Sequence, residues 1–230
     1  MTTKKYCVFI TALVMTIGAL GQDSLHNFQC GDEFTDLRDR QIYSTILIGD
    51  QCWMAENLNI GIMIQDFKQT SNGVIEKTCY DNNSQNCNTY GGLYTWYEAM
   101  NWTAEDNSQG ICPVGWHLPS RSEWEELVGF LGPKDAGQQM KATREHSPAW
   151  DGTNSSGFNA LPAGVGYKSS FGRIDKWAIF WSSTQVDQDF AWFAQLDNFW
   201  YPAPPKYKKL YIGTHFVKEN GFSVRCIKRN

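Results

Sequence analysis

The stretch GICPVGWHLPSRSEWEEL at residues 110–127 decides how the middle of the chain folds. Its SRSE segment has the pattern of a capping box, in which Ser120 and Glu123 satisfy each other's backbone amides at the start of a helix. Glu125 and Glu126 complement the helix dipole and need no catalytic explanation. The stretch therefore predicts a helix that begins after Ser120. Apolar residues follow at the spacing of one helix face, namely Trp124, Leu127, Val128 and Leu131.

His117 is the residue of this stretch that could act as a catalyst. A general base needs a nucleophile or an orienting acid within hydrogen-bond reach. The sequence neighbours of His117 are Trp116 and Leu118, which are both apolar. We therefore interpret His117 as structural, and the whole stretch as a turn that is anchored by a disulfide and leads into the helix.

Residues 1–21 have the pattern of a secretory signal. Lys4 and Lys5 precede an apolar segment at 7–20, and small residues then offer a cleavage point. The apolar segment is shorter than the roughly 20 residues that span a bilayer, and no lipid-attachment motif ends it. We therefore expect cleavage and export without a membrane span. We expect residues 22–33 to form a short linker and residues 34–230 to form one domain.

The charge and cysteine content after cleavage narrow the class of protein. Residues 1–21 contain two lysines and no acids, so the mature chain carries 18 basic and 24 acidic residues, a net charge of −6. This balance disfavours nucleic acid and anionic membranes as partners. The cysteine count falls from seven to six. An even number in an exported chain predicts three disulfides, for which fifteen pairings are possible.

These six cysteines are Cys30, Cys52, Cys79, Cys87, Cys112 and Cys226. A zinc site is the alternative interpretation of such a set. It is disfavoured because the chain has no C-x-x-C pair and no His-Cys pair at ligand spacing.

Local patterns predict further elements. Residues 41–48 and 51–54 are typical of a hairpin around a Gly-Asp turn. Residues 60–90 are polar and indicate a loop that a disulfide pins. Apolar residues between 93 and 100 follow the period of a helix and form a core stripe. Short strands are expected at 157–164, 178–184, 190–196 and 221–227, and an exposed aromatic loop at 198–207.

Seven motifs, in order along the chain, carry a family resemblance. They are DLRDRQIY at 36–43, GDQCWMAENLN at 49–59, YGGLYTW at 90–96, GICPVGWHLPS at 110–120, GFNALPAG at 157–164, FWSST at 180–184 and GFSVRC at 221–226. Together they closely resemble the Fibrobacter succinogenes major paralogous domain over about residues 34–230. The resemblance implies an exported bacterial domain with an α+β fold similar to C-type lectins and to the sulfatase-modifying enzymes that generate formylglycine. Two helices would pack on small antiparallel β-sheets with long loops, stabilised by disulfides.

The resemblance also implies which cysteines pair. In C-type-lectin-like domains a cysteine near a helix commonly pairs with one in the last strand. The implied pairs are Cys112 with Cys226, Cys79 with Cys87, and Cys30 with Cys52.

One position departs from the family pattern. The family usually has Asp-Gly in the early turn, where this chain has Asp39 followed by Arg40. Arginine resists the positive φ that glycine tolerates. We therefore expect this turn to differ in type from that of the family.

The favoured function is a non-catalytic binding module for a glycan or a protein, at the cell surface or in the envelope. Aromatic residues are dense after residue 177, where lectin-like folds display ligand-contacting loops. Trp and Tyr stack on sugar faces or anchor protein interfaces. The alternation of strand residues places Trp192 equally well in the core. The candidate ligand-binding residues are Trp192, Phe193, Asn198, Phe199, Trp200 and Tyr201.

Two alternatives stay open. A structural or adhesive surface protein would expose the same aromatic residues to another protein. An oxidase like the sulfatase-modifying enzymes would need a pair of reactive cysteines near the C-terminal end, with copper between them, and only Cys226 lies there. We expect no cofactor and no obligatory metal, because the sugar-binding motifs of calcium-dependent lectins are absent; Asp197-Asn198 is the nearest approach to one.

Overall fold

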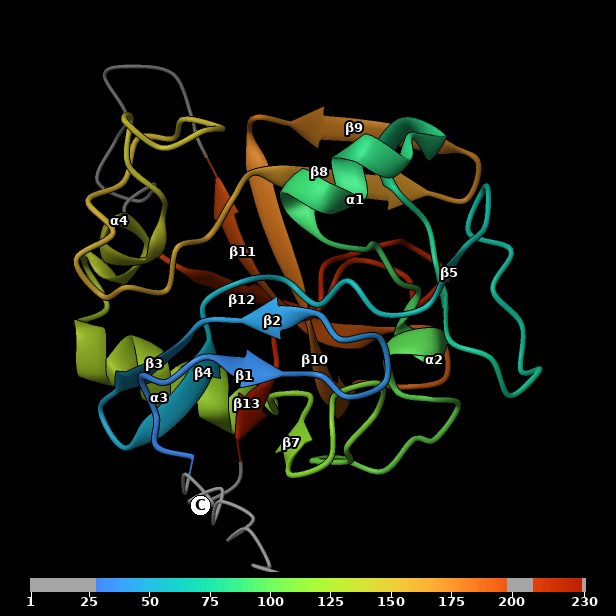
Figure 1. Ribbon diagram of the computed structural model, residues 1–230, viewed down its shortest axis with the longest axis horizontal. Coiled ribbons are helices and arrows are strands. Elements are labelled where there is room, and N and C mark those ends of the chain that lie inside the picture. Colours follow the sequence, from blue (N-terminus) through green and yellow to red (C-terminus); the bar gives the residue numbers. More distant parts are fainter. Residues whose placement is uncertain (1–27, 198–208, 229–230) are drawn as a thin grey trace, which may run out of the picture.

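Two sheets organise residues 28–197 and 209–228, the parts of the chain that the computed structural model describes (Figure 1). The larger sheet has the strand order β12-β11-β10-β8-β9. Strands β8 and β10 pair in parallel, and the other neighbours in this sheet are antiparallel. Its strands are β8 (Ala163–Tyr167), β9 (Ser170–Ile174), β10 (Trp177–Gln185), β11 (Ala191–Asp197) and β12 (Tyr211–Gly213).

The smaller sheet has the order β3-β4-β13-β7 and brings the two ends of the described chain together. Its strands are β3 (Thr45–Ile48), β4 (Gln51–Met54), β7 (Trp116–His117) and β13 (Ile227–Lys228). The Lys228 ammonium lies 5.6 Å from the ring centre of Phe28. Two further pairs complete the strands, β1 (Phe34–Thr35) with β2 (Ile42–Tyr43), and β5 (Ile62–Met63) with β6 (Glu76–Lys77).

The helices are short. They are the 3-10 turn η1 (Tyr80–Asn82), α1 (Ser84–Tyr90), α2 (Trp96–Ala99), α3 (Arg121–Leu131) and α4 (Ala136–Met140). The expected α+β class, small sheets and disulfides are confirmed. The described chain has four α-helices rather than the expected two, and its sheets are mostly but not entirely antiparallel. Both β8–β10 and β5–β6 are parallel pairs. None of the described helices has the length and apolar character needed to cross a membrane.

Helix α3 joins the two sheets. Its predicted capping box is present, with the Ser120 hydroxyl accepting from the Glu123 amide and the Glu123 carboxylate accepting from the Ser120 amide. The buried ring of Trp124 lies 4.7 Å from Trp53 of β4 and 5.7 Å from Phe180 of β10, measured between ring centres. Aromatic pairs at such distances add stabilisation beyond the area they bury. The helix is thus fixed to both sheets by one side chain.

Several predicted strands are confirmed and others are shifted. The hairpin of β3 and β4 turns at Gly49 and Asp50 as predicted, and β10 and β11 coincide with 178–184 and 190–196. The strand expected at 157–164 begins only at Ala163, and the one expected at 221–227 is mostly isolated bridges before β13.

The helix expected over 93–100 is shorter, because its first residues pair with other segments. The amide of Leu93 donates to Thr78 and that of Tyr94 donates to Phe222. A backbone amide in such a bridge cannot also bond within a helix. The helix begins only after Thr95, whose hydroxyl caps the Glu98 amide.

The three disulfides implied by the family resemblance are confirmed. Cys30 is bonded to Cys52, Cys79 to Cys87, and Cys112 to Cys226. The last pair joins residues 114 positions apart and ties the turn before β7 to the segment before β13. The expectation that a disulfide anchors the 110–127 stretch is therefore confirmed.

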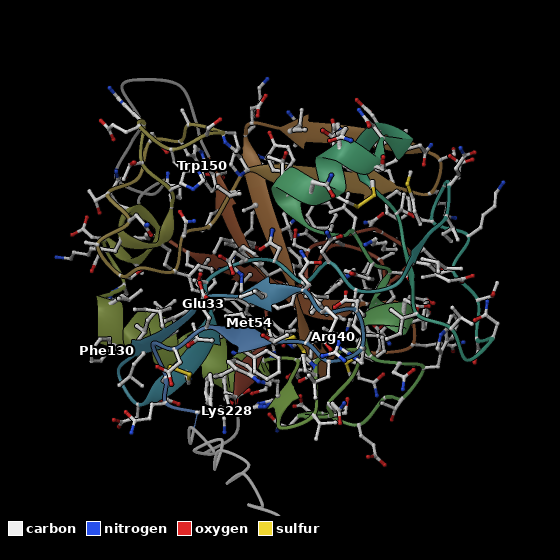
Figure 2. The ribbon with its side chains drawn as sticks, viewed as in Figure 1. Glu33, Arg40, Met54, Phe130, Trp150 and Lys228 are labelled. Atoms are coloured by element: carbon white, nitrogen blue, oxygen red, sulfur yellow. A yellow bond between two sulfur atoms is a disulfide. The ribbon has the colours of Figure 1, made fainter. Side chains whose placement is uncertain are left out.

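The turn that contains Arg40 has a left-handed residue, and its difference in type from the turn of the family stays a prediction. Arg40, which Figure 2 labels, has a left-handed backbone. Its φ is 67°, a conformation that glycine would adopt freely. Its amide donates to the carbonyl of Asp36, so the turn is closed by a backbone hydrogen bond. The arginine therefore adopts the left-handed backbone conformation that a side chain ordinarily disfavours.

Replacing Arg40 with glycine is expected to stabilise the protein by about 0.5 to 1 kcal/mol, because the strain at a left-handed residue outweighs the added freedom of the unfolded chain. Arg40→Ala is the matched control, since it removes the same side chain but keeps the Cβ. Denaturant unfolding of the three proteins measures the difference. An alanine variant that gains as much as the glycine variant would contradict this explanation.

Glu98 on α2 is a buried carboxylate. Its Oε1 accepts from the Glu76 amide at 3.0 Å. Burial raises the pKa of Glu98 above its ordinary value, outweighing hydrogen bonds from the Glu76 amide and the Trp102 side chain, and the charge of Glu76 adds to the rise. A carboxyl with a raised pKa binds more protons in the folded state than in the unfolded state, so its contribution to stability falls as pH rises through that window.

Glu98→Gln is accordingly expected to increase the free energy of unfolding near pH 7.5 and to change it less near pH 4.5. The reason is that glutamine removes the buried charge that only the higher pH imposes. Thermal unfolding at the two pH values, with the exposed Glu105→Gln as control, measures the effect. The same shift at both pH values would show that the charge of Glu98 is not responsible.

Candidate functional site

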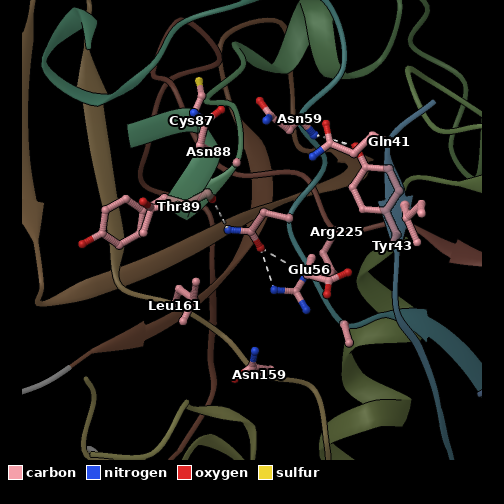
Figure 3. A pocket seen from close by; sticks show the side chains of 15 residues that line it. Gln41, Tyr43, Glu56, Asn59, Cys87, Asn88, Thr89, Asn159, Leu161 and Arg225 are labelled. Atoms are coloured by element: carbon pink, nitrogen blue, oxygen red, sulfur yellow. Dashed lines mark hydrogen bonds between the residues drawn. The ribbon is translucent and has the colours of Figure 1, made fainter. Parts of the chain in front are cut away.

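A polar pocket of about 210 Å³ lies beside β2 and α1 (Figure 3). Its walls come from β2, from residues 55–59 after β4, from the end of α1 and from residues 159–161 before β8. Arg225, close to the end of the described chain, also lines it. An amide side chain both donates and accepts hydrogen bonds. Five amides line the pocket, those of Gln41, Asn57, Asn59, Asn88 and Asn159.

The close contact between α1 and the segment after β4 depends on Gly91. Its φ is 80°, and a Cβ at this position would lie 2.6 Å from the Cβ of Asn57. The Asn57 Nδ2 donates to the carbonyl of Tyr90 at 2.8 Å and to the hydroxyl of Ser223 at 3.2 Å. These bonds fix the side chain of Asn57 so that its Oδ1 faces Arg225.

Arg225 is fully buried, and its guanidinium lies over the rings of Phe158 and Phe180, at 4.3 and 5.4 Å from the ring centres, and is held by hydrogen bonds. Its Nε and Nη2 donate to Asn57 Oδ1 at 3.1 and 2.6 Å. Its Nη1 donates to the carbonyls of Met54 at 3.1 Å and Phe158 at 2.6 Å. The guanidinium therefore joins three segments around the pocket, from β4, from the chain after it and from the segment before β8.

The charge of Arg225 has no counter-ion in contact. Within the described chain the guanidinium forms no ion pair. Burial lowers the pKa of Arg225 to about 9, and the charge of Glu56 only partly opposes this. Glu56 is exposed, and its carboxylate accepts from the Ser44 amide at 2.6 Å and from the Ser44 hydroxyl at 2.9 Å. The pocket lining thus contains a buried cation, Arg225, and a carboxylate, Glu56, that is hydrogen-bonded to Ser44 and not to that cation.

Some pocket-lining side chains already form hydrogen bonds within the protein, and others are available to bond a ligand. The hydroxyl of Tyr43 accepts from the Asn59 amide, and Lys77 donates to the side-chain oxygen of Asn59. The side-chain amide of Gln41 hydrogen-bonds to no described residue, and the side chain of Asn88 makes only a 3.4 Å contact with Gln85. Gln41 and Asn88 are therefore the groups most open to a ligand.

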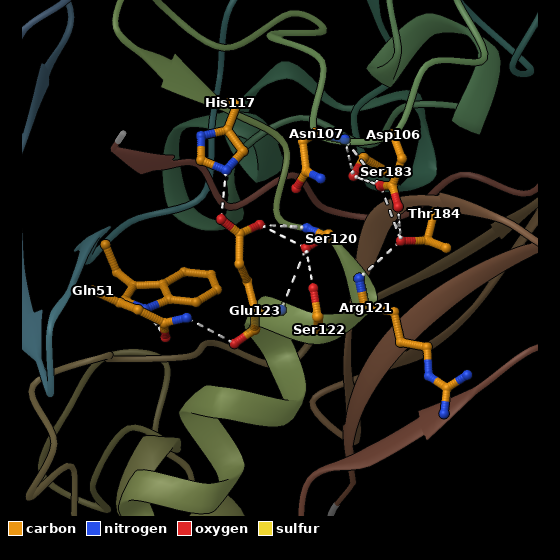
Figure 4. A network of polar contacts seen from close by, with 11 residues as sticks. Gln51, Asp106, Asn107, His117, Ser120, Arg121, Ser122, Glu123, Ser183 and Thr184 are labelled. Atoms are coloured by element: carbon orange, nitrogen blue, oxygen red, sulfur yellow. Dashed lines mark hydrogen bonds and ion pairs between the residues drawn. The ribbon is translucent and has the colours of Figure 1, made fainter. Parts of the chain in front are cut away.

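A second polar cluster surrounds His117 at the start of α3 (Figure 4). The His117 Nε2 lies 2.7 Å from Glu123 Oε1, so His117 does have an acid within reach, which the sequence neighbours did not reveal. Burial acts to raise the pKa of Glu123, but hydrogen bonds from His117 and Ser120 outweigh it and lower that pKa. The Ser120 hydroxyl bonds the carboxylate at 2.9 Å rather than the imidazole, so among the described residues no serine is paired with His117 as a nucleophile.

Of the six ligand-binding residues predicted from the sequence, the structure describes two, Trp192 and Phe193 of β11. Trp192 is half-buried, and the Arg121 guanidinium covers its ring at 3.9 Å (Figure 4 shows Arg121). Phe193 is fully buried among Phe216 and Phe222, at 5.1 and 5.9 Å between ring centres, so it offers no contact surface and is withdrawn as a ligand residue. Outside the described residues lie Asn198, Phe199, Trp200 and Tyr201.

Two groups of residues were missed by the sequence reasoning. The first is the pocket itself, for which the available signal was a lone arginine, Arg225, within an otherwise apolar run. The second is an aromatic pair at the end of α2, where Tyr97 and Trp102 stack at 5.9 Å with planes 14° apart. Trp102 is 41% exposed and adopts a φ of 62°, which is rare for a bulky residue.

The described residues include no free thiol for the chemistry of the sulfatase-modifying oxidases. Those enzymes need two reactive thiols, and all six cysteines among the described residues are bonded in disulfides. In particular Cys226 is bonded to Cys112. In the described ranges, no group of three or more His, Cys, Asp or Glu side chains is placed to hold a metal ion.

These features define a disulfide-bonded α+β domain with a polar, amide-lined pocket. The chain belongs to the Fibrobacter succinogenes major domain family, whose profile matches residues 46–228. The family membership predicted from the seven motifs is thereby confirmed. No curated protein and no solved structure matches the chain, and the likeness to C-type lectins stays a prediction.

Proposed function

We propose that this protein is an exported, non-catalytic binding module that holds a glycan in the amide-lined pocket. The observation that carries the proposal is the lining itself. Sugar hydroxyls both donate and accept hydrogen bonds, and amide side chains match them on both counts. The side-chain amides of Gln41 and Asn88 are available to hydrogen-bond a ligand. The side chain of Asn57, which also lines the pocket, is fixed by its bonds to Tyr90 and Ser223. A rigid polar pocket of this kind favours binding with little loss of conformational entropy.

The same lining argues for binding rather than turnover. Hydrolysis of a glycosidic bond in most enzymes needs two carboxyl groups that flank the bond. Glu56 is the one carboxylate among the described residues that line the pocket, and Ser44 occupies both of its oxygens. Nothing in this lining supplies the second carboxyl.

Export to the periplasm or the cell surface is part of the proposal. Three disulfides persist in an oxidising compartment and are rare in a reducing one. These disulfides and the signal-like pattern at 1–21 together support a bacterial protein that works outside the cytoplasm.

The test is binding of the oxidised mature chain, residues 22–230, to an array of glycans. Gln41→Ala and Asn88→Ala are expected to lose binding, whereas Gln188→Ala, an exposed amide on the turn after β10, is expected to keep it. Trp200→Ala and Tyr201→Ala test whether binding depends on the aromatic loop predicted at 198–207. Loss of binding only in these two variants would move the site to that loop. A folded protein that binds no glycan would favour a protein partner or a structural role.

A further inference from the structure

We infer that the pocket selects glycans that carry a carboxylate, such as those built from hexuronic acids, through the buried charge of Arg225. This inference rests on the proposed function, because it names the class of ligand for the same pocket. A guanidinium has five N–H groups, and Arg225 uses four of them on Asn57, Met54 and Phe158.

The remaining N–H belongs to Nη2. Because the guanidinium is planar, the bonds from Nε and Nη2 to Asn57 Oδ1 fix the plane and leave this N–H on the side away from Asn57. Figure 3 shows the guanidinium facing the space between Asn159 and Leu161, which both line the pocket. The cation therefore lies at the wall of the ligand space, and because its side chain is fully buried, its charge acts on a ligand from beneath the pocket surface.

The surroundings strengthen the effect of this charge. Arg225 is fully buried, so its field acts through a medium of low dielectric, where charges attract more strongly than in water. A buried cation without a counter-ion is costly, and an anion in the pocket would relieve that cost. A neutral sugar can offer hydroxyl oxygens as acceptors, but it brings no negative charge to compensate the guanidinium.

Glu56 opposes this selection to a limited degree. Its carboxylate also lines the pocket and would repel an acidic ligand. It is exposed and bound by Ser44, so water and two hydrogen bonds weaken its field. The two charges can be separated experimentally, because Glu56 lies outside the hydrogen-bond network that holds Arg225.

The experiment compares uronic acid oligosaccharides with their carboxyl-reduced counterparts, which differ only in that a hydroxymethyl group replaces each carboxylate. Calorimetric titration of the oxidised mature chain is expected to show binding of an acidic oligosaccharide about tenfold or more tighter than that of its neutral counterpart. Glu56→Gln keeps the size of the side chain and removes its charge. It is expected to tighten the acidic ligand about threefold and to leave the neutral one unchanged.

The outcomes distinguish this inference from the proposed function. Equal affinity for both members of each pair, with loss in Gln41→Ala, would overturn the selection for carboxylates and keep the glycan pocket. An acidic ligand that Glu56→Gln binds more weakly than the parent protein does would also overturn the selection, because removal of a negative charge from the lining should favour a carboxylate. Failure of both members to bind would overturn the pocket proposal together with the inference. Circular dichroism of each variant shows that a lost signal is not lost folding.

Discussion

Replacing Cys112 and Cys226 together with alanine is expected to lower the free energy of unfolding by about 4 to 5 kcal/mol. The bond closes a loop of 114 residues, and a crosslink removes more entropy from the unfolded chain when its loop is longer. Both cysteines are fully buried, so the alanines also leave a small cavity. Denaturant unfolding of the oxidised proteins measures the change.

The pair Cys79 and Cys87 provides the matched control. This bond closes a loop of 8 residues, for which the chain-entropy argument gives about 2.5 kcal/mol. Cys79→Ala with Cys87→Ala should therefore destabilise the protein about half as much as the loss of the long-range bond. Equal losses would mean that native contacts, rather than loop length, set the contribution of each disulfide.

Local signals in the sequence sufficed for elements that one segment determines. The capping box at Ser120 placed the start of α3, and the Gly49-Asp50 turn placed the hairpin of β3 and β4. In both cases the residues that decide the structure are within a few positions of one another. The disulfide pairs were not determined in this way; they came from the likeness to a family.

Helix α1 shows why some elements could not be predicted from the sequence. Its sequence, SQNCNTY, has no apolar stripe and few strong helix formers, so it was interpreted as part of a polar loop. The helix is stabilised by contacts beyond its own propensity. Asn83 caps the Gln85 amide, and the bond between Cys79 and Cys87 fixes the helix to the turn before it.

The pocket could not be predicted because it consists of distant contacts. Arg225 bonds Met54, 171 positions away, and Phe158, 67 positions away. No periodicity within residues 221–227 distinguishes such an arginine from one on the exposed face of a strand. The sequence indicated an aromatic binding surface instead, and in the described part that surface is reduced to Trp192, which Arg121 covers.

Arg225→Met is expected to lower the free energy of unfolding by about 3 kcal/mol. Methionine fills much of the same volume but donates no hydrogen bond, so the carbonyls of Met54 and Phe158 and the amide oxygen of Asn57 lose this donor. Each buried acceptor without a partner costs about 1 to 3 kcal/mol, and removal of the buried charge offsets part of the sum. Arg121→Met, at an exposed arginine paired with Glu125, is the control and should cost less than about 1 kcal/mol.

A double-mutant cycle with Asn57→Ala tests whether the loss comes from this network. Arg225 and Asn57 share two hydrogen bonds, so either substitution alone removes both of them. The double variant is therefore expected to be more stable than the sum of the single losses predicts, by about 1 to 2 kcal/mol. Losses that add would show that the two hydrogen bonds to Asn57 do not stabilise the fold. In that case the guanidinium would not be held in the orientation on which selection of a carboxylate depends.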